Sequence, residues 1–221
     1  MNTKTYRFFI KFGKKENIEA LQKGTIYMNC LSFFRTLPEE NLIGDKLEGI
    51  KSIRCLENVT LDLNIQKRDK ITLKSIGSVH IYPTEKYEGN IFCMYGADEN
   101  LLEKNLKGNR GRLQLGKSFS DSEYIAFINN PREFIRKIDE YFLQNGQKIE
   151  ISPVNYIDFS NHKGTLSPFD KREIYRGQNE VRIFVKNNFQ RPIMFNIGDI
   201  SDICHIAPAN KHNILEYRVN E

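Results

Sequence analysis

The sequence predicts an α+β fold in one domain over residues 1–221, made mainly of antiparallel sheet with a few helices. Three observations support this class. Short β-prone runs recur through the middle of the chain, one amphipathic helix stands out near residues 131–146, and the chain opens with a strand, a helix and a strand. No Pro/Gly/Ser-rich stretch offers a linker, so a single hydrophobic core is expected.

The opening unit combines two kinds of hydrophobic periodicity. Residues 6–12 alternate, and the pattern places Tyr6, Phe8, Ile10 and Phe12 on one face of a strand with Arg7 and Lys11 on the other. Residues 14–23 then predict a short helix that Gly24 ends as a C-terminal cap. A second strand over residues 25–31 follows at once, so we expect the two strands to lie close together.

The middle of the chain is predicted to be mainly sheet. Residues 39–49 are acidic and contain two glycines, which favours a loop or a short surface helix. The following β-prone runs, separated by polar residues, Gly or Pro, are 53–63, 71–73, 78–82 and 91–95. Residues 104–117 hold five basic side chains, three glycines and no acid, so a mobile cationic segment is expected there.

The clearest helix of the sequence begins after Asn130. Asn130 is a preferred N-cap residue, Pro131 suits the first turn, and Glu133 occupies the capping-box position. Apolar residues then line one helix face as far as Gly146. Three further strands are predicted at residues 154–159, 179–185 and 191–196.

Composition and motif searches argue against an exported or membrane-spanning protein and against several common kinds of catalytic site. The first residues show no apolar leader, and no run of eighteen apolar residues occurs, so we expect a cytoplasmic protein without a membrane partner. The four cysteines lie far apart and are expected to be reduced thiols. The histidines lack zinc-site spacing, and no nucleophile elbow or Walker loop is present. The net charge of +5 is compatible with a polyanionic partner without requiring one.

Two groups of polar residues are candidates for function. Gln178, Glu180 and Arg182 alternate with apolar residues, so they share the polar face of a predicted strand. That face has two other interpretations, a solvated surface and a structural ion pair between Glu180 and Arg182. Asp45 and Glu48 are spaced for a divalent cation or for a cap and salt-bridge role, and the incomplete ligand set favours the second.

The basic residues 104–117 have three interpretations. They are a solvated loop, a lid over a negatively charged cofactor, or a site for nucleic acid. The segment lacks the interleaved aromatic residues of a single-strand stacking platform, which favours the solvated loop.

Several short motifs together resemble a widespread family of bacterial and phage proteins. Members carry an early loop like N-D-P-F-E and a late strand like E-x-E-W-R. The matching segments here are Phe33-Phe34-Arg35, residues 44–49, Val154-x-Tyr156, Phe169-x-Lys171, Tyr175 and Gln178-x-Glu180-x-Arg182. This chain departs from the pattern in residues 44–48, in Gln178 and in Val181, and it lacks the family's histidine-containing W-x-x-Y segment.

That family is similar in layout to ADP-ribosyltransferases, and the similarity implies a function. Glu180 would hold the nicotinamide-ribose hydroxyls and stabilise the oxocarbenium-like transition state, and Gln178 would orient the acceptor. Arg7, Ser32 and Arg182 would bind the cofactor NAD, with Arg7 on its phosphates. The acceptor would be a protein or a nucleic acid, in a toxin or in phage–host conflict. The rival expectation is a non-enzymatic binding or inhibitor protein on the same fold, with Glu180 and Arg182 as a structural pair.

Overall fold

The computed structural model describes residues 5–40, 43–63, 71–109, 112–114, 119, 122–209 and 214–216.

The strand β7 (Gly89–Asp98) lies at the centre of the main sheet. Along the sheet the strand order is β10-β14-β7-β1-β9-β16, every pair is antiparallel, and β2 and β15 extend it from β7. The bounds of these strands are β1 Tyr6–Gly13, β2 Thr25–Cys30, β9 Tyr124–Ile128, β10 Glu150–Pro153, β14 Glu180–Lys186, β15 Ile193–Asn196 and β16 Cys204–Pro208. The predicted α+β class with mostly antiparallel sheet is confirmed.

The edge of β7 that faces away from β14 is divided between two strands. β14 pairs with β7 from Gly89 to Tyr95, which occupies most of one edge. On the other edge, β1 pairs at residues 95–98 and β2 pairs only at residues 90 and 91. The first two strands therefore meet the same neighbour at opposite ends, and the sheet is split between them.

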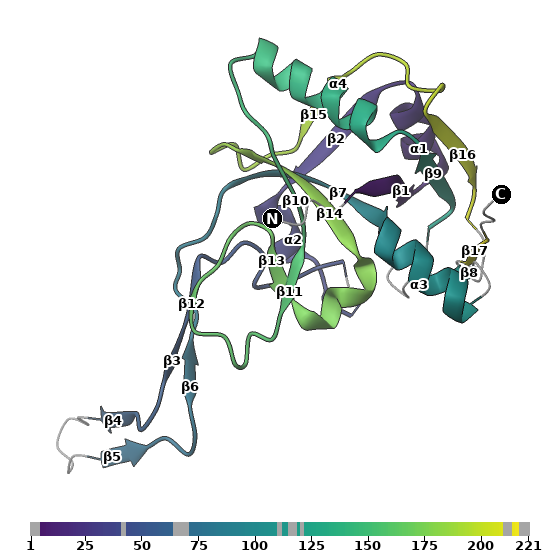
Figure 1. Ribbon diagram of the computed structural model, residues 1–221. Coiled ribbons are helices and arrows are strands. Elements are labelled where there is room, and N and C mark those ends of the chain that lie inside the picture. The colour runs from purple at the N-terminus through teal and green to yellow at the C-terminus, as the bar shows by residue number, and fades with distance from the viewer. Residues whose placement is uncertain are drawn as a thin grey trace.

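Helices cover both faces of this sheet (Figure 1). One face carries α1 (Lys15–Gln22) and α4 (Pro131–Gln144), and the apolar side chains beneath them form the largest core cluster of the described residues. The other face carries α3 (Glu99–Asn109), which packs with β8 (Arg112–Gln114) on a smaller cluster around Ile10 and Leu113. A short helix, α2 (Leu31–Thr36), follows β2 directly. No helix among the described residues is long and apolar enough to cross a membrane.

Helix α4 forms as its sequence predicts. The Asn130 side chain accepts a hydrogen bond from the Glu133 backbone N–H at 3.1 Å, and Pro131 opens the first turn. Phe134, Ile138 and Phe142 are buried on one stripe. Its apolar face and its cap are local properties of the sequence, which is why periodicity alone located it.

The remaining strands of the described residues form four small sheets. A long arm projects from the body in Figure 1 and consists of β3 and β6 at its base and β4 and β5 at its outer end. The predicted strand 53–63 is therefore two strands. The bounds are β3 Ser52–Leu56, β4 Thr60–Leu63, β5 Ile71–Lys74, β6 Val79–Ile81, β11 Asn155–Ile157, β12 Gly164–Thr165, β13 Asp170–Arg172 and β17 Ile214–Glu216. A 3₁₀ helix, η2 (Glu173–Gln178), links β13 to β14.

A β-bulge in β1 corrects the predicted face assignment of this strand. Tyr6 opposes Asp98 and Phe8 opposes Ala97, so Arg7 is an extra residue without a ladder partner. A bulge shifts the alternation by one residue. Tyr6 consequently packs with Phe9, at a ring-centroid distance of 5.4 Å, on the face opposite Phe8 and Ile10.

The basic segment 104–117 is more regular than predicted. Residues 104–109 are the last two turns of α3, and residues 112–114 form β8, which pairs with β17. Residues 110–111 and 115–117 lie outside the described residues. Helix propensity along residues 99–109 and strand pairing to a distant segment override the glycine and charge content that favoured a loop.

We predict that Gly24→Ala is far more costly than Gly146→Ala, although both glycines have a left-handed backbone with φ of +89° and +69°. A Cβ at Gly24 would lie 1.9 Å from the carbonyl oxygen of Gly198, whereas nothing lies within 4 Å of one at Gly146. Gly146→Ala should cost about 1 kcal/mol of unfolding free energy, and Gly24→Ala more than about 3 kcal/mol. Urea unfolding measures both, and equal costs would contradict the close contact between Gly24 and Gly198.

Candidate functional site

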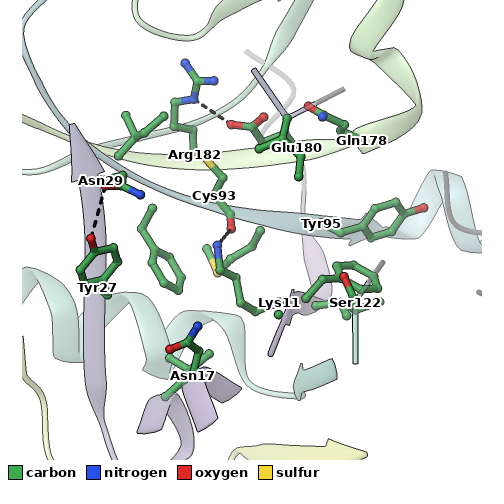
Figure 2. A pocket seen from close by; sticks show the side chains of 18 of the residues that line it. Lys11, Asn17, Tyr27, Asn29, Cys93, Tyr95, Ser122, Gln178, Glu180 and Arg182 are labelled. Carbon is green, nitrogen blue, oxygen red and sulfur yellow. Dashed lines mark hydrogen bonds and ion pairs between the residues drawn. The ribbon is translucent and has the colours of Figure 1, made fainter. Parts of the chain in front are cut away.

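A cavity of about 710 Å³ lies at the split between β1 and β2. Its walls come from β1, α1, β2 and β7 on one side, and from Glu48, Lys171, Gln178, Glu180 and Arg182 on the other. Figure 2 shows Glu180 and Arg182 on one strand with Cys93 beside them and Lys11 reaching toward Cys93 from β1. The volume lies within the range of roughly 300–1,000 Å³ that small-molecule sites occupy.

Four buried charges form one network at the polar end of this cavity. Arg182 is completely buried, and Glu180, Lys171 and Glu48 are between 2% and 6% exposed. Glu180 accepts hydrogen bonds from Arg182 Nε at 2.8 Å and from Lys171 Nζ at 3.2 Å. Glu48 completes the network with its Oε1 2.7 Å from Arg182 Nη1 and its Oε2 3.9 Å from Lys171 Nζ. Each carboxylate therefore lies against both cations.

The strand β14 places Glu180 and Arg182 in this network by simple alternation. Val181, Ile183 and Val185 point into the main core, so Glu180 and Arg182 point to the opposite face. The interpretation of that face as solvated is wrong, because both side chains are buried. The ion pair between Glu180 and Arg182 that the sequence left open is present.

Gln178 reaches the network from a different element than predicted. It ends η2, and Asn179, with φ of 40°, turns the chain before β14 begins at Glu180. The predicted shared strand face of Gln178 is therefore wrong. Lys171 Nζ nevertheless donates to Gln178 Oε1 at 2.8 Å, which holds the amide beside Glu180 in the cavity wall.

The network fixes the protonation states around it. Burial alone would raise the pKa of Glu180, but Arg182 and Lys171 outweigh it and hold that pKa well below the ordinary value. Burial and the negative charge of Glu180 raise the pKa of Cys93 to about 12. Burial, again with the charge of Glu180, raises the pKa of Tyr156, whose hydroxyl accepts the Glu180 backbone N–H at 2.9 Å. At neutral pH Glu180 is thus an anion beside a protonated thiol and a protonated phenol.

A second set of ion pairs joins Glu39 and Asp45 of the acidic loop to Arg172. Arg172 Nη2 lies 2.6 Å from Asp45 Oδ1 and also contacts Glu39. Asp45 accepts the Leu47 backbone N–H at 2.9 Å, and the Tyr175 hydroxyl donates to the Gly44 carbonyl at 2.6 Å. The expected cap and salt-bridge role of Asp45 and Glu48 is confirmed. The described residues of this segment form a loop, as one of the two expectations had it, and the structure adds that Asp45 and Glu48 are buried, at 1% and 2% exposed.

Lys11 lines the cavity and, among the described residues, has no carboxylate partner. Its Nζ donates to the Cys93 carbonyl at 2.7 Å and lies 4.6 Å from the centre of the Phe92 ring. No carboxylate among the described residues lies within 4.0 Å of this ammonium. Burial lowers the pKa of Lys11, with the charge of Glu180 acting in the opposite direction. A ligand anion would give this ammonium the partner that the described residues do not supply.

The other predicted cofactor residues lie elsewhere. Arg7, the bulge residue of β1, is exposed and pairs with Glu99 at the start of α3. The Ser32 hydroxyl in α2 donates to Cys30 Sγ at 3.1 Å. Neither residue lines the cavity, whereas Gln178, Glu180 and Arg182 all do. Lys11 lay on the predicted polar face of the first strand, but only the split of the sheet shows that it enters a cavity.

No metal centre is evident at this site. Within the ranges that the structure describes, no group of three His, Cys, Asp or Glu side chains is arranged to hold a metal ion. The four cysteines are all free, with Cys30 and Cys204 buried.

We predict that Glu180→Gln costs about 3 kcal/mol of unfolding free energy at pH 7, because Arg182 and Lys171 lose a buried counter-charge. The folded-state pKa of Glu180 lies below its unfolded value, so its contribution is complete above the ordinary glutamate pKa and is lost on acidification. The difference from the unmodified chain should shrink by about 1.4 kcal/mol per pH unit below roughly pH 4.

Asp45→Asn is the matched control for this prediction. Burial, with the charge of Glu48, raises the pKa of Asp45 despite Arg172. A raised carboxyl pKa favours the folded state as pH falls, so the cost of this variant should widen on acidification. Chemical denaturation at pH 7, 4 and 3 separates the two signs. A cost of Glu180→Gln that does not change with pH would contradict the ion-pair origin of its stability.

The chain has no match among protein-family models, curated proteins or solved structures. The function of the cavity is therefore inferred from its own residues.

Proposed function

We propose that the protein binds NAD in the cavity and transfers ADP-ribose to a protein or nucleic-acid acceptor. One observation supports this most: an ionised, immobilised carboxylate, Glu180, lines a cavity of ligand size at the split of the sheet. The layout of strand, helix, strand and late Gln178-x-Glu180 is also the layout that resembles ADP-ribosyltransferases.

The chemistry of this transfer needs a fixed negative charge beside the ribose. When the bond between nicotinamide and C1′ breaks, its electron pair leaves with nicotinamide and positive charge develops on the ribose. An acceptor atom then forms a bond to C1′ and loses its proton. A preorganised carboxylate stabilises the developing cation without having to reorient. Arg182 and Lys171 keep Glu180 both ionised and in place.

Glu180 keeps capacity for a ribose hydroxyl. An ionised carboxylate has about four acceptor sites. Arg182 Nε, Lys171 Nζ and the Cys93 thiol occupy three of them. One site is then left for a ligand hydroxyl. Gln178, held by Lys171 at the cavity wall, is the residue we assign to orienting the acceptor.

The residue that we assign to the pyrophosphate lies on the first strand, as expected, but is a different one. Arg7 is exposed and paired with Glu99, so we assign the pyrophosphate contact to Lys11, four residues along β1. Arg182 lines the cavity, but its ion pairs with Glu180 and Glu48 make it a residue that positions Glu180.

The second candidate is a non-enzymatic binding protein on the same fold. It is favoured by the ion pairs of the network, in which both carboxylates are paired with both cations, although Arg182 Nη2 has no hydrogen-bond partner among the described residues. That network joins the loop at residues 44–49, β13 and β14, and this would be sufficient reason for burying four charges. The two candidates differ in whether NAD is consumed.

We expect the unmodified protein to release nicotinamide from NAD when cell lysate supplies the acceptor, and Glu180→Gln to lower the rate about a hundredfold or more. Asp45→Asn is the control, because it also removes a buried carboxylate from an arginine yet does not line the cavity. Rates are compared at a temperature at which both variants remain folded. Absence of nicotinamide release by the unmodified protein would leave the binding-protein candidate, and equal rates in the two variants would remove Glu180 from the chemistry.

Lys11→Met should weaken the binding of ADP-ribose, which carries both phosphates but no cleavable nicotinamide bond. Losing one charge-assisted contact of about 1.5–3 kcal/mol corresponds to roughly 10- to 100-fold in affinity. The control is Lys15→Met on α1, since Lys15 is exposed, pairs with Glu19 and does not line the cavity. Isothermal titration calorimetry measures both. Matching affinities for the two variants would show that Lys11 does not hold the phosphates.

A further inference from the structure

The register of β7 gives the order of the polar residues along the cavity. Glu180 lies directly opposite Tyr95, and Lys11 Nζ donates to the carbonyl of Cys93, two residues earlier on β7. Asn29 of β2 pairs with the residue two positions earlier again. Each residue of an antiparallel strand advances about 3.4 Å, so these three positions follow one another along β7 at steps of roughly 7 Å.

The β2 end of the cavity carries an exposed apolar pair of side chains. Met194 of β15 lies directly opposite Tyr27 of β2, and directly opposite residues share a face of a sheet. Asn29 follows Tyr27 by two residues, so it has the same face. All three residues line the cavity, and Tyr27 and Met194 are 51% and 70% exposed. An aromatic ring beside a thioether is a surface on which a flat ring stacks.

Asn29 places an amide group beside this apolar pair. Figure 2 shows the Tyr27 ring with its hydroxyl turned along β2 toward Asn29, and that hydroxyl donates to Asn29 Oδ1 at 3.5 Å. The amide nitrogen of Asn29 has no acceptor in the described part of the chain. An amide matches the edge of adenine, because its oxygen accepts from the N6 amino group while its nitrogen donates to N7. The two lone pairs of the amide oxygen allow it to accept from Tyr27 and from N6 together.

We propose that Tyr27 and Met194 stack on the adenine ring of the ligand and that Asn29 selects adenine against other purines. The order along β7 is the reason for placing the base at this end. The identification of the ligand rests on the proposed function, in which the ribose at the cleaved bond lies at Glu180 and the pyrophosphate at Lys11. The adenosine is joined to the far side of the pyrophosphate, so it continues past Lys11 to β2.

ADP is the probe for stacking, since it carries the adenine and the pyrophosphate but no bond that the proposed reaction cleaves. Isothermal titration calorimetry should detect ADP binding to the full chain. Tyr27→Thr should weaken it about tenfold or more, because the base loses its aromatic partner, and Met194→Thr should also weaken it. Both side chains are exposed and threonine suits a strand, so both variants should fold. The control is Tyr82→Thr, which removes a ring that is 41% exposed and does not line the cavity.

Inosine diphosphate is the probe for Asn29. Its base has a carbonyl oxygen where adenine has the N6 amino group, so the amide oxygen of Asn29 meets an acceptor instead of a donor. The unmodified chain should bind ADP about tenfold or more tightly than inosine diphosphate. Asn29→Leu keeps the approximate size of the side chain and removes both hydrogen-bonding groups, so this preference should disappear. A merely structural role of Asn29 would leave the ratio of the two affinities unchanged.

Three results would overturn the adenine site. They are an unmodified chain that does not bind ADP, equal affinities of that chain for ADP and inosine diphosphate, and Tyr27→Thr binding ADP as tightly as Tyr82→Thr. In the last case, slower nicotinamide release by Tyr27→Thr with lysate as acceptor would assign the apolar pair to docking of the acceptor. Failure of the proposed function gives a different result. ADP binding with the expected preference but without nicotinamide release would remove the transfer reaction and leave the adenine site in place.

Discussion

The buried ion pairs of Arg182 connect segments that lie far apart in the chain. Its guanidinium pairs with Glu180 two residues earlier on the same strand and with Glu48 in the early loop, 134 residues away. Lys171 on β13 contacts the same two carboxylates. Desolvating four charges is expensive, and it is compensated only when the geometry of all of them is correct. The network therefore requires the loop at residues 44–49, β13 and β14 to be placed together, and the polar wall of the cavity depends on it.

The split of the sheet supplies the other half of the site. A single strand paired along this whole edge of β7 would have closed the sheet with backbone hydrogen bonds and left no gap for the cavity. Instead β1 pairs at one end of β7 and β2 at the other, and Lys11 bonds the Cys93 carbonyl between them. The same feature exposes the Lys11 ammonium to the cavity, and no carboxylate of the described part of the chain lies within 4.0 Å of it. The carboxylate of Glu180 and the ammonium of Lys11 thus line one ligand-sized space.

Local sequence signals located the regular elements well. The cap at Asn130, the helix stripe of α4, the glycine stop at Gly24 and the alternation from Val181 to Val185 depend on residues within one or two turns of each other. Glu48, Lys171, Gln178, Glu180 and Arg182 all lie in the short sequence motifs, but the sequence predicted only a possible pair of Glu180 with Arg182. Their convergence on one network is a finding of the structure, and the NAD chemistry that the resemblance implies remains a prediction.

The sequence by itself determined the α+β class, the main helix, and the identity of most of the charged residues in the site. Only the tertiary structure decided that these charges are buried. It also decided that the bulge residue Arg7 lies outside the cavity and that Lys11 lines it. The physical reason is that burial and strand register depend on partners distant in the chain. A bulge reverses side-chain direction without changing composition, and a carboxylate such as Glu48 looks the same in sequence whether it meets water or Arg182.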